Sequence, residues 1–333
     1  MGSLLRTILR RLPVLSERAL PGKTLLPTAE CGLYDGACEK GNRISSYEDV
    51  GDSRRNGQPV CAGVAVLVDE RMKRLYILKV GTTYPDTAKT WGDFGAWTAA
   101  ALGELALETA ILDVEQGASL PAAAECAGLV ITGSHSMVTD ALPWSIELEQ
   151  WIPSLLAAGI PLFGICYGHQ LLARASGGEV HFHPEGEEIG TVKVHLLPDC
   201  AGDVLFRTLP RTFGAHVVHS QSVLRLPPGS VCLAMNAFEP HQAFRIGECA
   251  WGVQFHPEYS AAIMRSYIEH ATELEPSEKS ERLGAVKETP AAAQVLRNFG
   301  RFVADRARGS LMLPKTGRCI PLPRRDRNPE TCR

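Results

Sequence analysis

The chain has 333 residues, of which 45% are hydrophobic and 21% are charged, and both fractions are ordinary for a globular protein. Its formal net charge of -3 argues against a protein that coats nucleic acid or a membrane, and no apolar run approaches the roughly 18 residues that cross a bilayer. The ten cysteines include no C-x-x-C pair, which indicates free thiols in a reducing compartment. We therefore expect a cytoplasmic protein with neither nucleic acid nor a membrane as its partner.

The first 71 residues form an extension that we expect to be poorly ordered. They mix Gly, Pro, Ser and charged residues without sustained periodicity, although residues 60–68 could add an edge strand. The opening MGSLLRTILRRL is arginine-bearing, free of acids and amphipathic, which is one signature of an organellar transit peptide. We favour the alternative of a misassigned upstream extension, because Met72 stands immediately before the first clear strand and would make a natural start.

Strands and helices alternate through the following hundred residues. Apolar runs at 75–80, 110–114 and 128–132 predict strands, whereas residues 91–107 and 145–158 predict helices. This alternation predicts a doubly wound, mainly parallel sheet in which ligand chemistry takes place at the carboxyl ends of the strands.

Residues 161–178, PLFGICYGHQLLARASGG, predict a short strand, a sharp turn with one cysteine, and a helix that ends at paired glycines. Gly164 and Gly168 lie two residues on either side of Cys166, so no bulky neighbour prevents the thiol from protruding. The helix N-terminus beside the sulfur favours the reactive thiolate. Taken alone, Cys166 could equally be a small buried hydrophobe, as most free cysteines are.

A second motif, AWGVQFHPEYS at residues 250–260, favours the interpretation of Cys166 as a nucleophile. Its apolar residues alternate as in a strand, and Pro257 keeps His256 extended. Because His256 and Glu258 are two residues apart, their side chains share one side of the chain. A cysteine, a histidine and a carboxylate are the parts of a nucleophilic acyl-transfer triad.

The motif GICYGHQ followed by GVQFHPE resembles the class I, triad-type glutamine amidotransferases, and more narrowly the stand-alone members similar to the amidotransferase domain of GMP synthase. This resemblance implies an α/β fold over residues 72–307: a three-layer, doubly wound, mainly parallel sheet of the flavodoxin-like kind, with a small antiparallel insertion. Strand-like runs between the two motifs match that insertion. They lie at residues 179–182, 189–196, 211–219, 231–235 and 242–246.

The resemblance also implies roles for individual residues. Cys166 would be the nucleophile, His256 the general base and Glu258 the carboxylate that orients the imidazole. The oxyanion would be bound by the loop at Gly133 and Ser134 and by the backbone N–H of Tyr167, although GSHS departs from the glycine- and proline-richer loop of many relatives. The residues implied to contact substrate are Gln170, His219, Ser220 and Gln221; Ser220 and Gln221 stand where GMP synthase domains usually have Gly and Asp.

Three histidines raise the alternative of a metal site. His181 and His183 share a strand face, and His195 follows in the next strand. No cysteine or carboxylate completes a recognised ligand spacing, so solvent-exposed histidines at a sheet edge are the favoured interpretation. We expect neither a metal nor a cofactor.

The carboxyl-terminal part contains two predicted helices and a tail. Residues 259–273 and 289–307 predict helices separated by a charged, proline-containing linker. Residues 308–333 are basic and proline-rich, which is typical of a disordered segment.

The reaction that these motifs imply is hydrolysis of glutamine or another small γ-glutamyl amide through a cysteine thioester. The chain has no Gly-rich nucleotide loop of the kind that an ATP-dependent acceptor domain needs, so ammonia would pass to a separate synthetase subunit. One alternative is a stand-alone γ-glutamyl peptidase without an acceptor. A non-catalytic regulatory binding module is a third possibility, which the intact Cys166, His256 and Glu258 disfavour.

Overall fold

The computed structural model describes residues 73–309. The predictions for residues 1–72 and for the tail from residue 310 lie outside the described residues. In the described part, no helix is long and apolar enough to cross a membrane.

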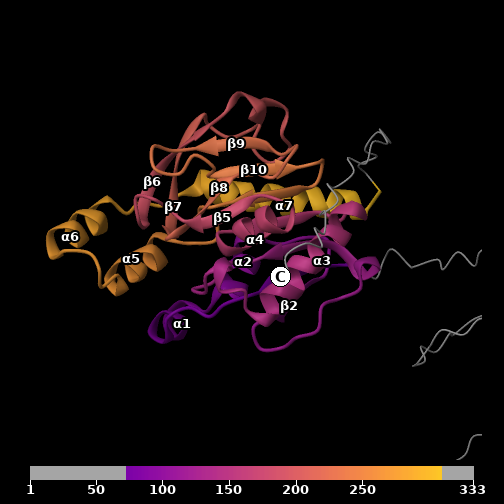
Figure 1. The fold of residues 1–333 in the computed structure, drawn as a ribbon, viewed down its shortest axis with the longest axis horizontal. Helices are drawn as coiled ribbons and strands as arrows, with labels where there is room; N and C mark the ends of the chain where they lie inside the picture. Colours follow the sequence, from indigo (N-terminus) through magenta and orange to yellow (C-terminus); the bar gives the residue numbers. More distant parts are fainter. Residues whose placement is uncertain (1–72, 310–333) are drawn as a thin grey trace, which may run out of the picture. The chain divides into compact units, whose positions relative to one another are not determined.

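The described chain forms one large mixed sheet, a small second sheet and helices on both faces (Figure 1). The strands are β1 (Arg74–Lys79), β2 (Thr109–Asp113), β3 (Cys126–Ile131), β4 (Leu162–Ile165), β5 (Glu179–Phe182), β6 (Glu188–Leu196), β7 (Thr212–His219), β8 (Gln221–Arg225), β9 (Val231–Met235), β10 (Ala243–Ile246) and β11 (Ala250–Val253). The α-helices are α1 (Pro85–Trp91), α2 (Phe94–Leu102), α3 (Pro143–Ala157), α4 (Tyr167–Ala175), α5 (Ala261–His270), α6 (Pro276–Ala285) and α7 (Pro290–Ala307).

The large sheet has the strand order β2-β1-β3-β4-β11-β10-β9-β6-β7. Its first five strands pair in parallel, as the alternation of strands and helices predicted. The remaining strands pair antiparallel and come from the segment between the cysteine and histidine motifs. The predicted insertion therefore extends the edge of the parallel sheet, while β5 and β8 form a separate two-stranded sheet.

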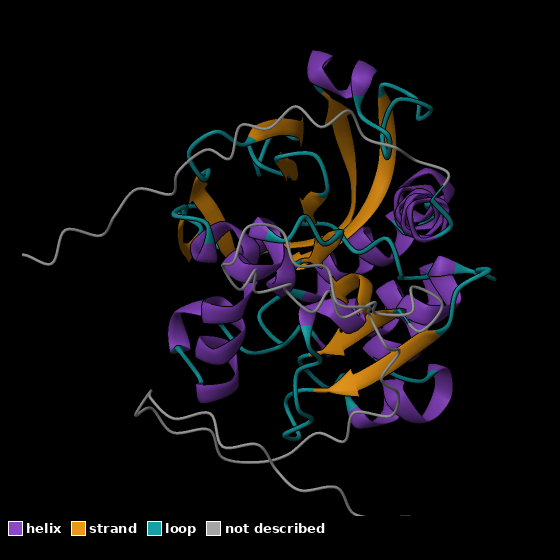
Figure 2. Cartoon of the chain, turned by 90° about the vertical axis from the view of Figure 1, so that its right-hand side faces the viewer, coloured by secondary structure: helices purple, strands orange, loops and turns teal. Residues whose placement is uncertain are grey.

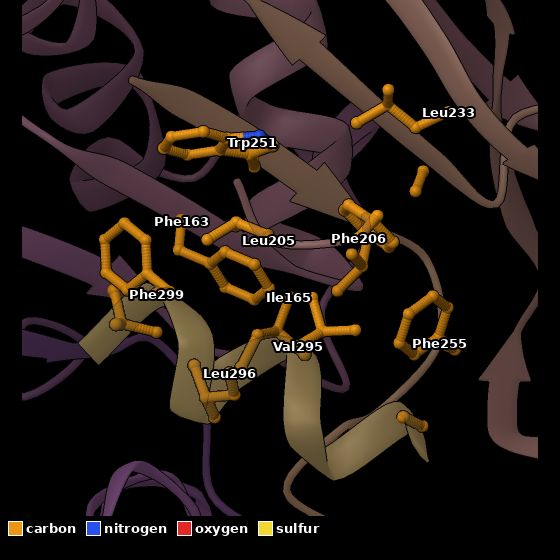
Figure 3. Packing of buried hydrophobic residues seen from close by; sticks show 14 of the residues in the cluster. Phe163, Ile165, Leu205, Phe206, Leu233, Trp251, Phe255, Val295, Leu296 and Phe299 are labelled. Carbon is orange, nitrogen blue, oxygen red and sulfur yellow. The ribbon is translucent and has the colours of Figure 1, made fainter. Parts of the chain in front are cut away.

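Alternating side chains on the parallel strands build a core on each face of the sheet. Leu75 and Ile77 of β1 belong to the core covered by α7, whereas Tyr76 and Leu78 belong to the core covered by α3 and α4. Figure 3 shows the first core, where the rings of Phe163 on β4 and Phe299 on α7 lie 5.2 Å apart. Figure 2 shows the helices on both sides of the strands, so the predicted three-layer, doubly wound fold is confirmed.

Two helical predictions were wrong in detail. The helix predicted at 91–107 is the shorter α2, which ends at Gly103 with φ of 74°; α1, which was not predicted, precedes it and ends at Gly92 with φ of 85°. The linker predicted after residue 273 contains α6, which begins at Pro276 and is capped by a hydrogen bond from the Glu275 N–H to the Glu278 carboxylate at 3.3 Å. No residue of α6 is fully buried, so this helix lacks the buried apolar face that identified the other helices.

Candidate active site

Cys166 occupies a strained turn between β4 and α4. Its φ of 49° lies in the left-handed region, where only Ala141 joins it among the non-glycine residues of the described chain. The flanking glycines allow a close approach of backbones: a Cβ on Gly164 would lie 2.3 Å from the carbonyl oxygen of Gly168, and one on Gly168 would lie 2.4 Å from that of Ile131. The two glycines thus allow the start of α4 to pack directly against the sheet. This close packing requires glycine more strictly than the space around the thiol does.

The sulfur of Cys166 lies at the N-terminus of α4. The Cys166 N–H donates to the carbonyl oxygen of Val253 at 2.8 Å, which ties the turn to β11, and Sγ lies 3.6 Å from the carbonyl oxygen of Val218. Tyr167 is the first residue of the helix, a position whose N–H has no acceptor within the helix. The helix dipole at this point favours a negative sulfur.

His256 and Glu258 form a buried pair directly after β11. The His256 Nδ1–H donates to Glu258 Oε1 at 2.8 Å, which leaves Nε2 for the thiol. Burial lowers the pKa of His256, but the negative charges of Glu258 and of Cys166 outweigh it and raise the pKa to about 10. The imidazole is therefore a cation at neutral pH, and the geometry fits a thiolate–imidazolium pair. The ring of Tyr259 stacks on the imidazole with centroids 4.1 Å apart.

The loop predicted to bind the oxyanion lies beside this pair. Ser134 and Tyr167 line the same cavity as Cys166 and His256. Gly133 packs against the imidazole, because a Cβ there would lie 3.0 Å from Cε1 of His256. The structure thus brings Gly133 and Ser134, which follow β3, and Tyr167, which begins α4 after β4, to the region around Cys166 and His256.

The residues predicted to contact substrate line the other side of the cavity. Gln170, His219, Ser220 and Gln221 all reach it. The side-chain amide of Gln170 donates to the carbonyl oxygen of Gln221 at 2.7 Å and to Oε1 of Gln254 at 3.0 Å. These bonds fix the Gln170 amide while its side chain faces the cavity.

Glu188 is a buried residue of the site that the sequence analysis missed. Its carboxylate lies 3.0 Å from Nε2 of His219 and accepts hydrogen bonds from Asn236 at 2.6 Å and Gln242 at 3.1 Å. Nδ1 of His219 lies 3.1 Å from the carbonyl oxygen of Gln221, so both ring nitrogens face acceptors. Glu188 and His219 are opposite each other in the β6–β7 register, and pairing the two predicted strands as a hairpin would have found this contact.

A group of aromatic residues at the cavity was also missed. These residues are Tyr84, His135, Tyr259 and Tyr267, and the carboxylate of Glu187 lines the cavity with them. They come from three separate segments of the chain, with Tyr259 and Tyr267 in or next to α5, so no single local sequence pattern connects all four.

The three histidines of the metal hypothesis do not meet. His181 and His183 lie on or just after β5 in the small sheet, whereas His195 lies in the large sheet with Nδ1 3.1 Å from Oγ1 of Thr212. The ring of His183 stacks on Phe238 at 4.0 Å. Within residues 73–309, no group of three or more His, Cys, Asp or Glu side chains is arranged to hold a metal ion.

Comparisons with known proteins agree with the fold and the motifs. Residues 92–271, more than half of the chain, match the model of the family described as glutamine amidotransferase class-I. A GMP synthase (glutamine-hydrolyzing) of Aeropyrum pernix is 30% identical over 215 residues, covering 60% of this chain and 40% of the relative. A gamma-glutamyl-L-1-hydroxyisopropylamide hydrolase of a Pseudomonas species is 32% identical over 179 residues, covering 52% of this chain and 60% of the relative. The chain thus spans less than two thirds of the length of either protein.

The fold has counterparts among solved structures. A glutamine amidotransferase from Thermotoga maritima superposes with a TM-score of 0.55 at 24% identity, covering 70% of this chain and 98% of the other. The family match covers the elements that carry Cys166, His256 and Glu258. The chain belongs to the class I glutamine amidotransferase family.

Proposed function

We propose that the protein hydrolyses a γ-glutamyl amide through a thioester on Cys166, with His256 as the proton carrier and Glu258 as the group that orients it. The observation that carries this proposal is the conjunction of three features in one cavity: a cysteine in a strained turn, a helix N-terminus at its sulfur, and an imidazolium held by a buried carboxylate. Each feature serves a step of acyl transfer.

The proposed steps follow from the charges of the pair. The Cys166 thiolate attacks the side-chain carbonyl carbon, and the negative oxygen forms beside the N–H groups of Ser134 and Tyr167. The carbon–nitrogen bond breaks as His256 donates its proton to the departing ammonia or amine. Water then attacks the thioester while His256 takes its proton, and glutamate leaves as the thiolate is restored. In these steps His256 acts first as an acid towards the departing nitrogen and then as a base towards water.

Two fates of the released amine are compatible with this chemistry. A Methanocaldococcus jannaschii relative, named as one subunit of a glutamine-hydrolyzing GMP synthase, is 36% identical over 135 residues, 65% of its length. This likeness supports delivery of ammonia to a separate synthetase subunit. The Pseudomonas hydrolase supports a stand-alone γ-glutamyl hydrolase with no acceptor. The non-catalytic binding module is disfavoured, because a purely binding role requires neither the strained cysteine nor the buried ion pair.

The proposed function is tested by measuring glutamate release from glutamine and from γ-glutamyl amides, with and without candidate synthetase subunits. We expect the full chain to release glutamate, Cys166→Ser to release none, and the control Cys200→Ser to keep the wild-type rate. Stimulation of glutamine hydrolysis by a partner would support an amidotransferase that delivers ammonia to a synthetase subunit. Hydrolysis that no partner stimulates would support a stand-alone γ-glutamyl hydrolase. Equal rates for the wild type and Cys166→Ser would contradict the proposal.

A further inference from the structure

The side of the cavity next to His256 is built from aromatic rings in contact. Tyr259 stacks on the His256 imidazole, and the rings of Tyr259 and Tyr267 lie 5.1 Å apart. Tyr84 is 5.2 Å from Tyr267 and 4.7 Å from His135, whose Nε2 lies 3.0 Å from the Tyr267 hydroxyl. We call Tyr84, His135, Tyr259 and Tyr267 the aromatic wall. It begins at the catalytic imidazole and continues to the mouth of the cavity.

The chemistry of the reaction assigns this wall to the leaving group. In the proposed function, His256 protonates the departing nitrogen, so whatever substituent that nitrogen carries lies next to the imidazole and against the rings that stack on it. Gln170, His219 and Gln221 give the cavity polar lining residues suited to the glutamyl part. Ammonia would not contact four aromatic side chains, whereas a larger amine would.

One carboxylate, Glu187, lines the cavity together with this wall. Glu187 is exposed and lines the same cavity as Tyr84, and burial together with the charge of Glu187 raises the pKa of Tyr84. Within residues 73–309, the Glu187 carboxylate forms no side-chain hydrogen bond or ion pair, although the charges of His219 and Arg282 act on it. Arg282 donates Nη1 to the carbonyl oxygen of Ile189 at 2.6 Å and is not part of the lining.

The lining therefore has a definite charge preference. No Lys or Arg of the described chain lines the cavity, and Glu187 is the one carboxylate that lines it together with the aromatic residues. Such faces attract cations, and a nearby carboxylate adds to the attraction, whereas a carboxylate on the ligand would be repelled.

Resting on the proposed function, we propose that the preferred substrates are γ-glutamyl amides whose leaving amine carries a positive charge, held between the aromatic wall and Glu187. The preferred class is the γ-glutamyl monoamide of a diamine. A γ-glutamyl amide whose leaving group ends in a carboxylate, such as a γ-glutamyl dipeptide, is the disfavoured class.

The test is a series of three amides of equal chain length: γ-glutamyl-1,4-diaminobutane, γ-glutamyl-butylamide and γ-glutamyl-4-aminobutyrate, which end in a cation, a methyl group and an anion. We expect kcat/KM of the full chain to be at least about fivefold higher for the cation than for the anion, with the neutral amide between them. This ratio should fall as ionic strength rises.

Matched variants assign the preference to residues. Glu187→Gln should bring the cation-to-anion ratio towards one, while Glu185→Gln, which removes the same charge two residues away and outside the cavity, should keep the wild-type ratio. Tyr84→Leu keeps an apolar side chain but loses the ring face, so it should lower kcat/KM for the cation more than for the neutral amide.

The outcomes separate this inference from the function on which it rests. A wild-type enzyme that favours the anion or treats all three amides alike, or a ratio that Glu187→Gln leaves intact, overturns the inference. Turnover of glutamine with refusal of all three amides also overturns the inference but leaves the proposed function standing. Failure to hydrolyse glutamine and every amide overturns both.

Discussion

At the scale of single residues, the charge state of His256 governs the chemistry. Burial lowers its pKa, but the charges of Glu258 and Cys166 outweigh burial and bring the pKa to about 10, above the ordinary value of 6.5. The imidazolium therefore contributes stability that is fully present below pH 6.5 and is lost as the pH rises towards about 10. Catalysis is limited to the same pH range, because only the protonated His256 can donate a proton to a leaving amine.

This charge state predicts the pH profile of Glu258→Gln. The amide oxygen can still accept from Nδ1 of His256, but it no longer supplies a negative charge, so the pKa of His256 should fall. We expect the alkaline limb of the kcat profile to move to lower pH and kcat at neutral pH to drop about 100-fold. The pH dependence of glutamate release measures both effects. An unchanged alkaline limb would show that Glu258 does not set the charge of His256.

His256→Ala is the companion variant. It removes the group that protonates the leaving nitrogen, so we expect turnover to fall below detection while the fold remains intact. Circular dichroism checks the fold. Chelators should leave the activity of the wild type unchanged, and a loss of activity that added zinc restores would revive the metal hypothesis.

At the scale of elements, the junction of β4 and α4 holds the site together. Gly164 has no room for a side chain, because the nearest atom to an added Cβ would be a backbone oxygen that cannot move alone. We expect Gly164→Ala to lower the free energy of unfolding by about 3 kcal/mol, near the upper end for overpacking. Gly284→Ala in α6 is the control, since an added Cβ there meets nothing within 4 Å and should stabilise the helix slightly. Thermal unfolding compares the two, and equal melting temperatures would contradict this account of the junction.

Gly133→Ala tests a smaller clash at the loop after β3. An added Cβ would lie 3.0 Å from the His256 ring, which can move only by disturbing its bond to Glu258. We expect the variant to fold but to lose about 10- to 100-fold in kcat, because a displaced proton donor is poorly aligned with the leaving nitrogen. Melting temperature and glutamate release, measured together, distinguish misalignment from unfolding.

The elements themselves could be predicted where burial leaves a pattern in the sequence. Strands β1, β2 and β3 were expected within about two residues of their observed bounds, because each is a short run of mainly apolar residues. Strand β8 was not expected, since its pairing with β5 depends on a partner more than 35 residues away. Helix α6 was not expected because its residues are charged or small for the most part and none of them is fully buried.

At the scale of the whole molecule, the described residues contain the cores on both faces of the sheet and every residue that we assign to the site. The elements that carry Cys166, His256 and Glu258 lie between β4 and α5, and α7 closes one face of the sheet. We predict that a protein of residues 72–308 is soluble, unfolds cooperatively and keeps the hydrolytic activity of the full chain. Aggregation or inactivity of the shorter protein, when the full chain has neither defect, would give residues 1–71 a structural role.

The site as a whole could be predicted only in part. Cys166 and the His256–Glu258 pair were expected because each belongs to a short motif whose spacing fixes the local geometry. The aromatic wall and Glu188 were not expected, since their residues meet only after the sheet and helices have packed. The charge and shape that a cavity prefers in its ligand depend on residues that are far apart in the sequence. The nucleophile and the base, in contrast, can be predicted from short local motifs.

The most direct test of the central claim is labelling with a glutamine-like chloroketone, followed by peptide mass spectrometry. Burial raises the pKa of Cys126 to about 12 and also raises the pKa of Cys232, so neither competes as a thiolate, whereas Cys166 lies beside an imidazolium. The account predicts one label per chain, on Cys166, with loss of glutamate release in proportion to labelling. Modification of Cys126 or Cys232 with Cys166 untouched and activity abolished would contradict it.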